Sequence, residues 1–320
     1  MDKKEKIKEL QEIIKQELTP LITHDYVLWG LPYYSNIGDT LIWEGELEFL
    51  KSVPHKCLNT CGWDEYRVRP LPLNTVILIT GGGYFGDVWR KAWGNVMNTI
   101  EHYPDNPIII LPNTIFYNNE EVIRSDAVRL SKLKKLTICV RDKVSYEIAK
   151  NNFRNDVRLV PDMAFYIKNT YLEQWRKPET DKILYLKRID KELGETEVNL
   201  KNSKTDVRDW PTMDGKPNIT ERIFGKIYEY SHSPKLKRLL GNKILHQVEK
   251  FFAYNFYRQN LTRRGVEFIS QYSEVYSTRL HVMILSVLLG KKVYYIDNSY
   301  GKLSSFYDTW LADCEKVEKY

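Results

Sequence analysis

The chain of 320 residues lacks any long hydrophobic segment, since every apolar run falls well short of the ~18 residues that cross a bilayer as a helix. It has only four cysteines, too few for a disulfide scaffold at this length, and Cys57 and Cys61 have no second pair nearby to complete a zinc site. Its 48 lysines and arginines are interspersed with 42 acids rather than segregated. These absences argue against a membrane-spanning protein, a disulfide-rich secreted protein and a nucleic-acid partner.

The first residues are charged and lead into apolar positions at helical spacing, namely Ile7, Leu10, Ile14 and Leu18. This spacing predicts an amphipathic helix lying on the fold, and its acids are not typical of a signal or transit peptide. We therefore expect a cytoplasmic protein with reduced thiols. The net charge of +6 suits an anionic small molecule or the surface of a membrane.

Short runs rich in Val, Ile and Leu alternate with helical patterns along the chain. Strands are predicted at 26–30, 75–80, 107–112, 136–140, 157–160, 182–187, 266–269 and 292–297. Continuous apolar strands between helices predict doubly wound parallel sheets, and the length predicts two domains. We therefore expect an α/β protein with two Rossmann-like domains, residues 1–170 and 171–320. Residues 190 to 243 lack clear periodicity and are predicted to form an irregular insertion.

A polar segment near the C-terminus opens an apolar helix; it reads Ser277-Thr278-Arg279-Leu280-His281, and Gly290 is expected to end the helix. Ser277 or Thr278 is expected to cap this helix, which places Arg279 and His281 in its first turn. Free backbone amides and the helix dipole favour a phosphate or carboxylate there, and an arginine binds either with two hydrogen bonds. The alternative is structural, with Arg279 in a surface ion pair and His281 bonded to a carbonyl group.

A glycine-rich segment follows the strand at 75–80; it reads Gly81-Gly82-Gly83-Tyr84-Phe85-Gly86 and precedes a predicted helix. This is the context of the dinucleotide-binding fingerprint. The acid that would bind the ribose is missing, however, because the next strand ends at Leu111-Pro112-Asn113. NAD is therefore not expected. Gly82 and Gly83 either let backbone amides approach another ligand or permit a tight turn.

Polar residues also follow other strands at their carboxyl ends, where open α/β sheets bind ligands. In the turn formed by residues 36–39, Asp39 is either a base toward a hydroxyl group or a helix cap. Arg141 follows a later strand and is a candidate to hold an anion, whereas Asp142 is expected to cap a helix. Asp162, in a Val-Pro-Asp turn, is expected to be structural.

The segment from Pro234 to Leu245 mixes basic and apolar residues and runs into the aromatic residues at 251–254. Such a segment contacts an anionic bilayer through its Lys and Arg residues while burying its apolar side chains. The alternative is a core helix with a solvated basic edge.

Together these motifs resemble the polysaccharide pyruvyl transferase family over about residues 25 to 300. In order, they are Asn36 to Asp39, Gly81 to Gly83, Arg141 to Ser145, Val160 to Asp162 and Ser277 to His281. The resemblance implies a fold like the two-domain GT-B glycosyltransferases, with an interdomain cleft. It also implies transfer of pyruvate from phosphoenolpyruvate onto a sugar as a cyclic ketal, with release of phosphate and with no metal or cofactor.

This chemistry needs cations for the donor, an acid that protonates the methylene carbon and a base for the sugar hydroxyls. Arg279 and Arg141 suit the first task, His281 the second and Asp39 the third. The remaining candidates for substrate binding are Asn36, Gly82, Gly83, Ser277 and Thr278. The acceptor is expected to be a sugar of a cell-surface exopolysaccharide or capsular polysaccharide precursor, carried on a lipid. Such an acceptor implies peripheral contact with the inner face of the cell membrane.

Two other functions compete with this interpretation. A GT-B glycosyltransferase that uses a nucleotide sugar also needs a phosphate site in the interdomain cleft. A non-catalytic polysaccharide-assembly protein is the second alternative. Residues 190–243 match nothing in the family pattern, so the sequence leaves the acceptor sugar open.

Overall fold

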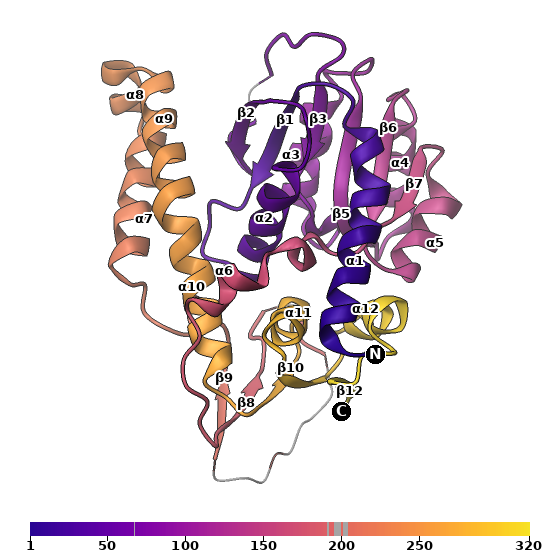
Figure 1. Cartoon of the computed structure of the whole chain (residues 1–320). Helices are drawn as coiled ribbons and strands as arrows, with labels where there is room; N and C mark the ends of the chain where they lie inside the picture. Colours follow the sequence, from indigo (N-terminus) through magenta and orange to yellow (C-terminus); the bar gives the residue numbers. More distant parts are fainter. Residues whose placement is uncertain (67, 191, 195–199, 201–203) are drawn as a thin grey trace.

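The computed structural model describes residues 1–66, 68–190, 192–194, 200 and 204–320. These residues form two parallel β-sheets with helices packed against them (Figure 1). The prediction of an α/β fold with parallel sheets is confirmed, while the domain limits at 170 and 171 stay a prediction.

The first sheet has seven parallel strands in the order β2-β1-β3-β5-β6-β7, with β4 paired to β5. They are β1 (Tyr26–Leu31), β2 (Cys57–Gly62), β3 (Val76–Ile79), β4 (Gly82–Gly86), β5 (Ile108–Phe116), β6 (Leu136–Val140) and β7 (Asp156–Leu159). Leu28 of β1 lies opposite Leu78 of β3. Because β1 has β2 on one side and β3 on the other, the strand order reverses between β1 and β3, and ligands bind at such a point.

The second sheet has five parallel strands in the order β12-β11-β10-β8-β9. They are β8 (Ile183–Leu186), β9 (Thr205–Arg208), β10 (Glu274–Ser277), β11 (Lys292–Tyr295) and β12 (Val317–Lys319). Here β8 takes the place that β1 has in the first sheet, with Tyr185 opposite Tyr276 of β10. The order therefore reverses between β8 and β10, which defines a second ligand-binding position of the same kind.

Twelve α-helices are present in the described part of the chain. They are α1 (Lys3–Leu18), α2 (Ile37–Leu50), α3 (Arg90–Ile100), α4 (Glu120–Leu130), α5 (Lys143–Asn152), α6 (Asn169–Glu173), α7 (Ile219–His232), α8 (Pro234–Leu240), α9 (Asn242–Phe252), α10 (Arg258–Ser270), α11 (Leu280–Leu289) and α12 (Lys302–Trp310). One cluster of buried side chains extends from Leu28 in the first sheet through Trp43 on α2 to Val275 in the second. The two sheets are therefore joined through a shared core.

Helix α1 confirms the amphipathic pattern predicted for the first residues, since Leu10, Ile14 and Leu18 are buried. It packs on α11, the helix between β10 and β11 of the second sheet. The amino group of Met1 donates a hydrogen bond of 2.6 Å to the carbonyl of Asp313. The two ends of the chain consequently lie close together (Figure 1).

The strand predicted at 266–269 is wrong, because these residues belong to α10. Leu261, Gly265 and Ile269 are buried at helical spacing, so the segment has the period of a helix. A Cβ on Gly265 would come within 2.6 Å of Ile37, and the glycine therefore lets α10 pack closely on α2. The strand that precedes α11 is instead β10, which follows α10 in the sequence.

The prediction that residues 190–243 are irregular is wrong for much of that range, because it contains β9, α7 and α8. Helix α7 begins with a capping box, in which Asn218 and Glu221 each bond the other's backbone amide. With α9, these helices form what we call the helical arm (residues 219–252), which lies beside the β2 edge of the first sheet (Figure 1). The predicted insertion also covers residues 191, 195–199 and 201–203, which lie outside the described residues.

The glycine-rich segment departs from the expected strand–loop–helix context. Gly82–Gly86 is strand β4, and α3 begins only at Arg90. A Cβ on Gly86 would lie 1.8 Å from the carbonyl oxygen of Phe116, and φ is +136° there. Glycine is therefore needed at Gly86 for β4 to pair with β5.

Candidate active site

A cavity of about 420 Å³ is lined by residues that follow the strands at both reversal points. The part of the chain that forms the first sheet contributes residues after β1, β3 and β6. The part that forms the second sheet contributes residues after β8 and β10. The ionisable side chains of Arg, Lys, His, Asp and Glu in the lining are Asp39, Arg141, Arg188, Asp190, Glu192, Arg279, His281 and Lys302. The cavity therefore brings together charges from segments far apart in the sequence.

The structure places most of the predicted site residues at this cavity; they are Asn36, Asp39, Gly83, Arg141, Arg279 and His281. Gly82, Ser277 and Thr278 lie outside the lining. The hydroxyl of Ser277 accepts a hydrogen bond of 2.9 Å from the backbone amide of Arg279. The hydroxyl of Thr278 accepts one of the same length from the backbone amide of Arg188. Both hydroxyl groups therefore shape the backbone of the site.

Arg141 is fully buried at the end of β6 and has an unused hydrogen-bond donor. Its Nε donates to Thr114 at 2.9 Å and its Nη1 donates to Asp162 at 2.6 Å. Its Nη2 has no hydrogen-bond partner among the described residues. A buried donor without a partner costs about 1–3 kcal/mol, so this nitrogen suits a ligand oxygen in the cavity.

Lys302, at the start of α12, reaches the same part of the cavity as Arg141. A Cβ placed on Gly83 would lie 2.6 Å from Lys302 Nζ and 3.2 Å from Arg141 Nη2. Gly83 therefore leaves room for two cations to converge over its backbone. Burial lowers the pKa of Lys302 and the charge of Arg141 lowers it further, although Glu192 opposes both. A bound anion would offset part of that cost.

Asp162 connects Arg141 to His281. One oxygen of Asp162, Oδ2, lies 2.6 Å from Arg141 Nη1 and 3.3 Å from His281 Nε2. Burial would raise the pKa of Asp162, but the charges of His281 and Arg141 outweigh it and hold this pKa well below its usual range. Asp162 is thus a buried carboxylate that orients two cavity residues, in addition to its bond from the amide of Ala164.

The predicted cap of α11 is wrong, because Arg279 itself is the N-cap and its side chain makes no capping bond. The guanidinium of Arg279 instead forms two hydrogen bonds with Asp209, of 2.5 and 2.7 Å, and lies 3.1 Å from Asp190. Burial would lower the pKa of Arg279, but these carboxylates raise it above its ordinary value. Arg279 therefore lines the cavity while being held by two acids.

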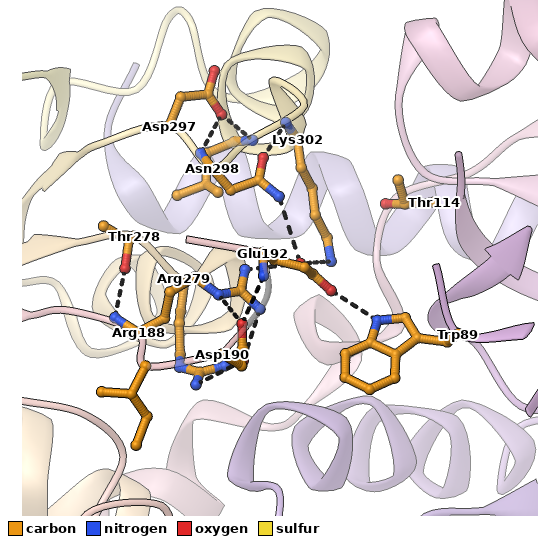
Figure 2. A network of polar contacts seen from close by, with 12 residues as sticks. Trp89, Thr114, Arg188, Asp190, Glu192, Thr278, Arg279, Asp297, Asn298 and Lys302 are labelled. Atoms are coloured by element: carbon orange, nitrogen blue, oxygen red, sulfur yellow. Dashed lines mark hydrogen bonds and ion pairs between the residues drawn. The ribbon is translucent and has the colours of Figure 1, made fainter. Parts of the chain in front are cut away.

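Glu192 is the centre of a second network, which Figure 2 shows. Its oxygens accept hydrogen bonds of 2.8 Å from Trp89 Nε1 and Arg188 Nη1, and Lys302 Nζ lies 3.7 Å away. Burial would raise the pKa of Glu192, but the charges of Lys302 and Arg188 hold it well below its usual range. Because Arg188 also pairs with Asp190, these acids are neutralised by cations rather than arranged around a metal ion.

Asp39 lies in the first turn of α2 and is not its cap. The N-cap is Asn36, whose Oδ1 accepts the amide of Gly38 at 2.9 Å. In the described part of the chain, both hydrogen bonds to Asp39 fall on Oδ2; one comes from Asn36 Nδ2 at 2.7 Å and one from the hydroxyl of Tyr34 at 2.9 Å. The other oxygen of Asp39 is therefore the one suited to a substrate hydroxyl.

Several cavity residues were not predicted from the sequence, and one of them had a signal. Arg188 follows β8 as Arg141 follows β6, so the rule that selected Arg141 also selects Arg188. Asp162 lies outside the cavity lining and is structural, as expected, although its contacts with Arg141 and His281 were not predicted. Glu192 and Lys302 have no such signal, because only the tertiary contacts of their loops bring them to the cavity.

This fold, with cations gathered at the carboxyl ends of two doubly wound parallel sheets, defines a Rossmann-like α/β protein with a site suited to an anionic ligand. The chain belongs to the polysaccharide pyruvyl transferase family, whose model matches residues 36–300. The match begins at Asn36, the cap that holds Asp39, and extends beyond His281.

Individual relatives agree with this family. The chain is 28% identical over 310 residues to "Putative pyruvyl transferase EpsO" of Bacillus subtilis (strain 168), covering 96% of this chain and 90% of that protein. It is 24% identical over 308 residues to "Pyruvyl transferase 1" of Schizosaccharomyces pombe, covering 90% of this chain and 70% of that protein. A crystal structure of an uncharacterised Klebsiella pneumoniae protein has the same fold, with a TM-score of 0.64, 20% identity and coverage of 97% and 98% of the two chains.

Proposed function

We propose that the protein transfers pyruvate from phosphoenolpyruvate to a sugar of a cell-surface polysaccharide precursor as a cyclic ketal. The observation that carries this proposal is the unpartnered Nη2 of the buried Arg141, which meets Lys302 over Gly83. Phosphoenolpyruvate carries a phosphate and a carboxylate, and a pair of converging cations suits either group.

The reaction needs one proton at carbon and the loss of two hydroxyl protons. A sugar hydroxyl adds to C2 while the methylene carbon becomes a methyl group; phosphate then leaves, and a second hydroxyl closes the ring. We assign the proton donor to His281, because this imidazole lines the cavity and the Asp162 carboxylate, 3.3 Å from Nε2, orients its ring. We assign Asp39 as the base toward the hydroxyls.

The acceptor has aromatic surfaces available on the cavity wall. Trp63 and Trp89 line it, and Tyr34 lies edge-on to Trp63 with 6.0 Å between ring centroids. Flat apolar rings beside hydroxyl and carboxylate groups match the two faces of a sugar. We therefore place the sugar between these rings and Asp39.

The helical arm supports a lipid-linked acceptor. Its outer side chains are apolar and exposed, with Leu239 at 75% and Phe251 at 61% relative exposure. They are interspersed with lysines and arginines, namely Lys235, Lys237, Arg238, Lys243 and Lys250. No helix in the described part of the chain combines the length and the apolar content needed to cross a membrane. We propose that the arm lies on the inner face of the cell membrane, as a basic amphipathic surface does.

The decisive experiment is incubation of the purified protein with phosphoenolpyruvate and a panel of lipid-linked sugars. We expect release of phosphate only when a suitable sugar is present, together with a product that mass spectrometry identifies as its pyruvate ketal. Thermal unfolding with phosphoenolpyruvate or with nucleotide sugars separates the alternatives. Stabilisation by a nucleotide sugar alone would favour a glycosyltransferase, and no response to either donor would favour a non-catalytic protein.

A further inference from the structure

A cluster of carboxylate and imidazole groups lies outside the cavity, between the helical arm and the loop after β2. Glu65 comes from that loop, His232 from the end of α7, and Glu249 from α9. One ligand atom from each of these residues lies within 4.8 Å of the other two. Neighbours in a tetrahedral zinc site are about 3.4 Å apart, so only small adjustments would bring these atoms around one ion.

The two histidines are oriented in the way that metal sites require. His232 Nδ1 donates to the carbonyl of Tyr228 at 2.9 Å, and its Nε2 lies 3.6 Å from Glu65 Oε1. His246 Nδ1 donates to the other oxygen of Glu65 at 2.6 Å. Metal-binding histidines usually donate their second N–H to a carbonyl, and metal-binding carboxylates are usually held by a hydrogen bond.

Unsatisfied buried oxygens provide an independent sign of a ligand. Glu249 has no exposed surface, and its Oε1 has no hydrogen-bond partner among the described residues, while Oε2 accepts the hydroxyl of Ser231. The Oδ1 of the neighbouring Asp64 is also buried without such a partner. A divalent cation would give both unsatisfied oxygens a partner.

We propose that Glu65, His232 and Glu249 bind a divalent transition-metal ion of the zinc type, with Asp64 as a fourth ligand. Asp64 Oδ2 lies 3.8 Å from His232 Nε2. Mixed imidazole and carboxylate ligands suit zinc better than magnesium or calcium, which prefer oxygen alone.

Such an ion would connect the helical arm to the wall of the cavity. In the sequence, Glu65 stands between Trp63 and Tyr66, and both of these residues line the cavity. Because the ion would hold Glu65 against two helices of the arm, its effect would be on the stability of this contact. The inference is independent of the proposed transferase activity.

The test is metal binding by the full chain. After loading with Zn²⁺ and dialysis, we expect elemental analysis to find about one zinc per chain. Saturating Zn²⁺ should raise the Tm by about 3 °C or more over protein treated with chelator. Glu249→Gln, which keeps the shape and the Ser231 contact, and His232→Gln should both lose the zinc and the shift. His102→Gln is the matched control, since His102 Nδ1 is similarly placed 2.8 Å from a carbonyl but belongs to no such cluster among the described residues.

Three outcomes would overturn the proposal. The first is wild-type protein that retains no zinc after dialysis and shows no change in Tm. The second is a zinc content and a shift that survive in both site variants, which would place the metal elsewhere. The third is stabilisation by Mg²⁺ or Ca²⁺ but not by Zn²⁺. Because the first and third use wild-type protein, the test does not depend on whether a variant folds.

Discussion

The backbone of Gly38 lies directly against the imidazole of His281. A Cβ placed on Gly38 would come within 2.6 Å of Nδ1 and 3.0 Å of the ring carbon Cγ. The turn that carries Asp39 and the helix start that carries His281 are thus in contact, although more than 240 residues separate them in the sequence. Through this contact the two halves of the chain contribute to one site.

His281 is the residue whose replacement tests the chemical step. In a His281→Gln variant, an amide can still bond Asp162 but cannot protonate carbon. We expect release of phosphate from phosphoenolpyruvate, measured with an acceptor present, to fall at least about 100-fold. A His102→Gln variant, altered on the surface, should keep its activity. Near-normal phosphate release by His281→Gln would show that another group donates the proton.

Lys302 tests donor binding, and its replacement also removes one of the two cations that pair with Glu192. In Lys302→Gln, Glu192 still has Arg188 and Trp89, so we expect little change in the urea midpoint of unfolding. One lost charged hydrogen bond should raise the KM for phosphoenolpyruvate about tenfold or more. Lys316→Gln, which changes an exposed lysine bonded to the carbonyl of Gly290, is the control. An unchanged KM would remove Lys302 from the donor site.

Arg279 has a structural contribution that must be separated from any role toward the donor. Arg279→Met leaves the buried Asp209 without its cation and should lower the free energy of unfolding by roughly 3–5 kcal/mol. Adding Asp209→Asn should restore a large part of that loss, as measured by urea denaturation. If Arg279→Met instead keeps full stability and only weakens donor saturation, the arginine acts on the donor and not on the fold.

Glu46 predicts a specific dependence of stability on pH. Burial raises its pKa to about 8, although the amide of Gly81 and the hydroxyl of Thr80 would lower it. The unfolded carboxyl has a pKa of about 4.3, so between these values the folded state keeps a proton that the unfolded state has released. The contribution of Glu46 to the free energy of unfolding therefore falls as pH rises through this window.

The variant that checks this is Glu46→Gln, which stays neutral at every pH. From pH 5.5 to 7 we expect the wild type to lose on the order of 2 kcal/mol relative to the variant. Urea denaturation at several pH values measures the difference. Parallel curves for the two proteins would mean that Glu46 is already ionised in the folded state.

The helical arm predicts binding to anionic vesicles. Replacing Leu239 and Phe251 by serine removes exposed apolar surface, and we expect co-sedimentation with vesicles containing phosphatidylglycerol to weaken at least about tenfold. Activity on a lipid-linked acceptor should fall, while activity on a water-soluble form of the same sugar should not. Val128→Ser, at an exposed position on α4, is the control. Equal vesicle binding by all three proteins would exclude the arm as the membrane contact.

Much of the fold could be predicted because its signals are local. The apolar runs at β1, β3, β5 and β6 have few alternatives as buried parallel strands, and turns or caps mark the ends of their helices. Prediction failed at 266–269 because a short apolar run fits a strand as well as a helix. It failed in the arm because α7 and α8 leave much of their apolar surface exposed.

From the sequence alone came the main strands of the first sheet and the residues that follow them. That was enough to select Asp39 and Arg141, because parallel strands place the residues after them at one edge of a sheet. Arg279 and His281 were selected from the start of an apolar helix, although the strand before it was not predicted. Only the tertiary structure decided their partners. Asp162 holds both Arg141 and His281, Asp209 holds Arg279, and Lys302 approaches Gly83. Distances of a few ångströms between remote segments depend on how the two sheets pack, and no local pattern encodes that.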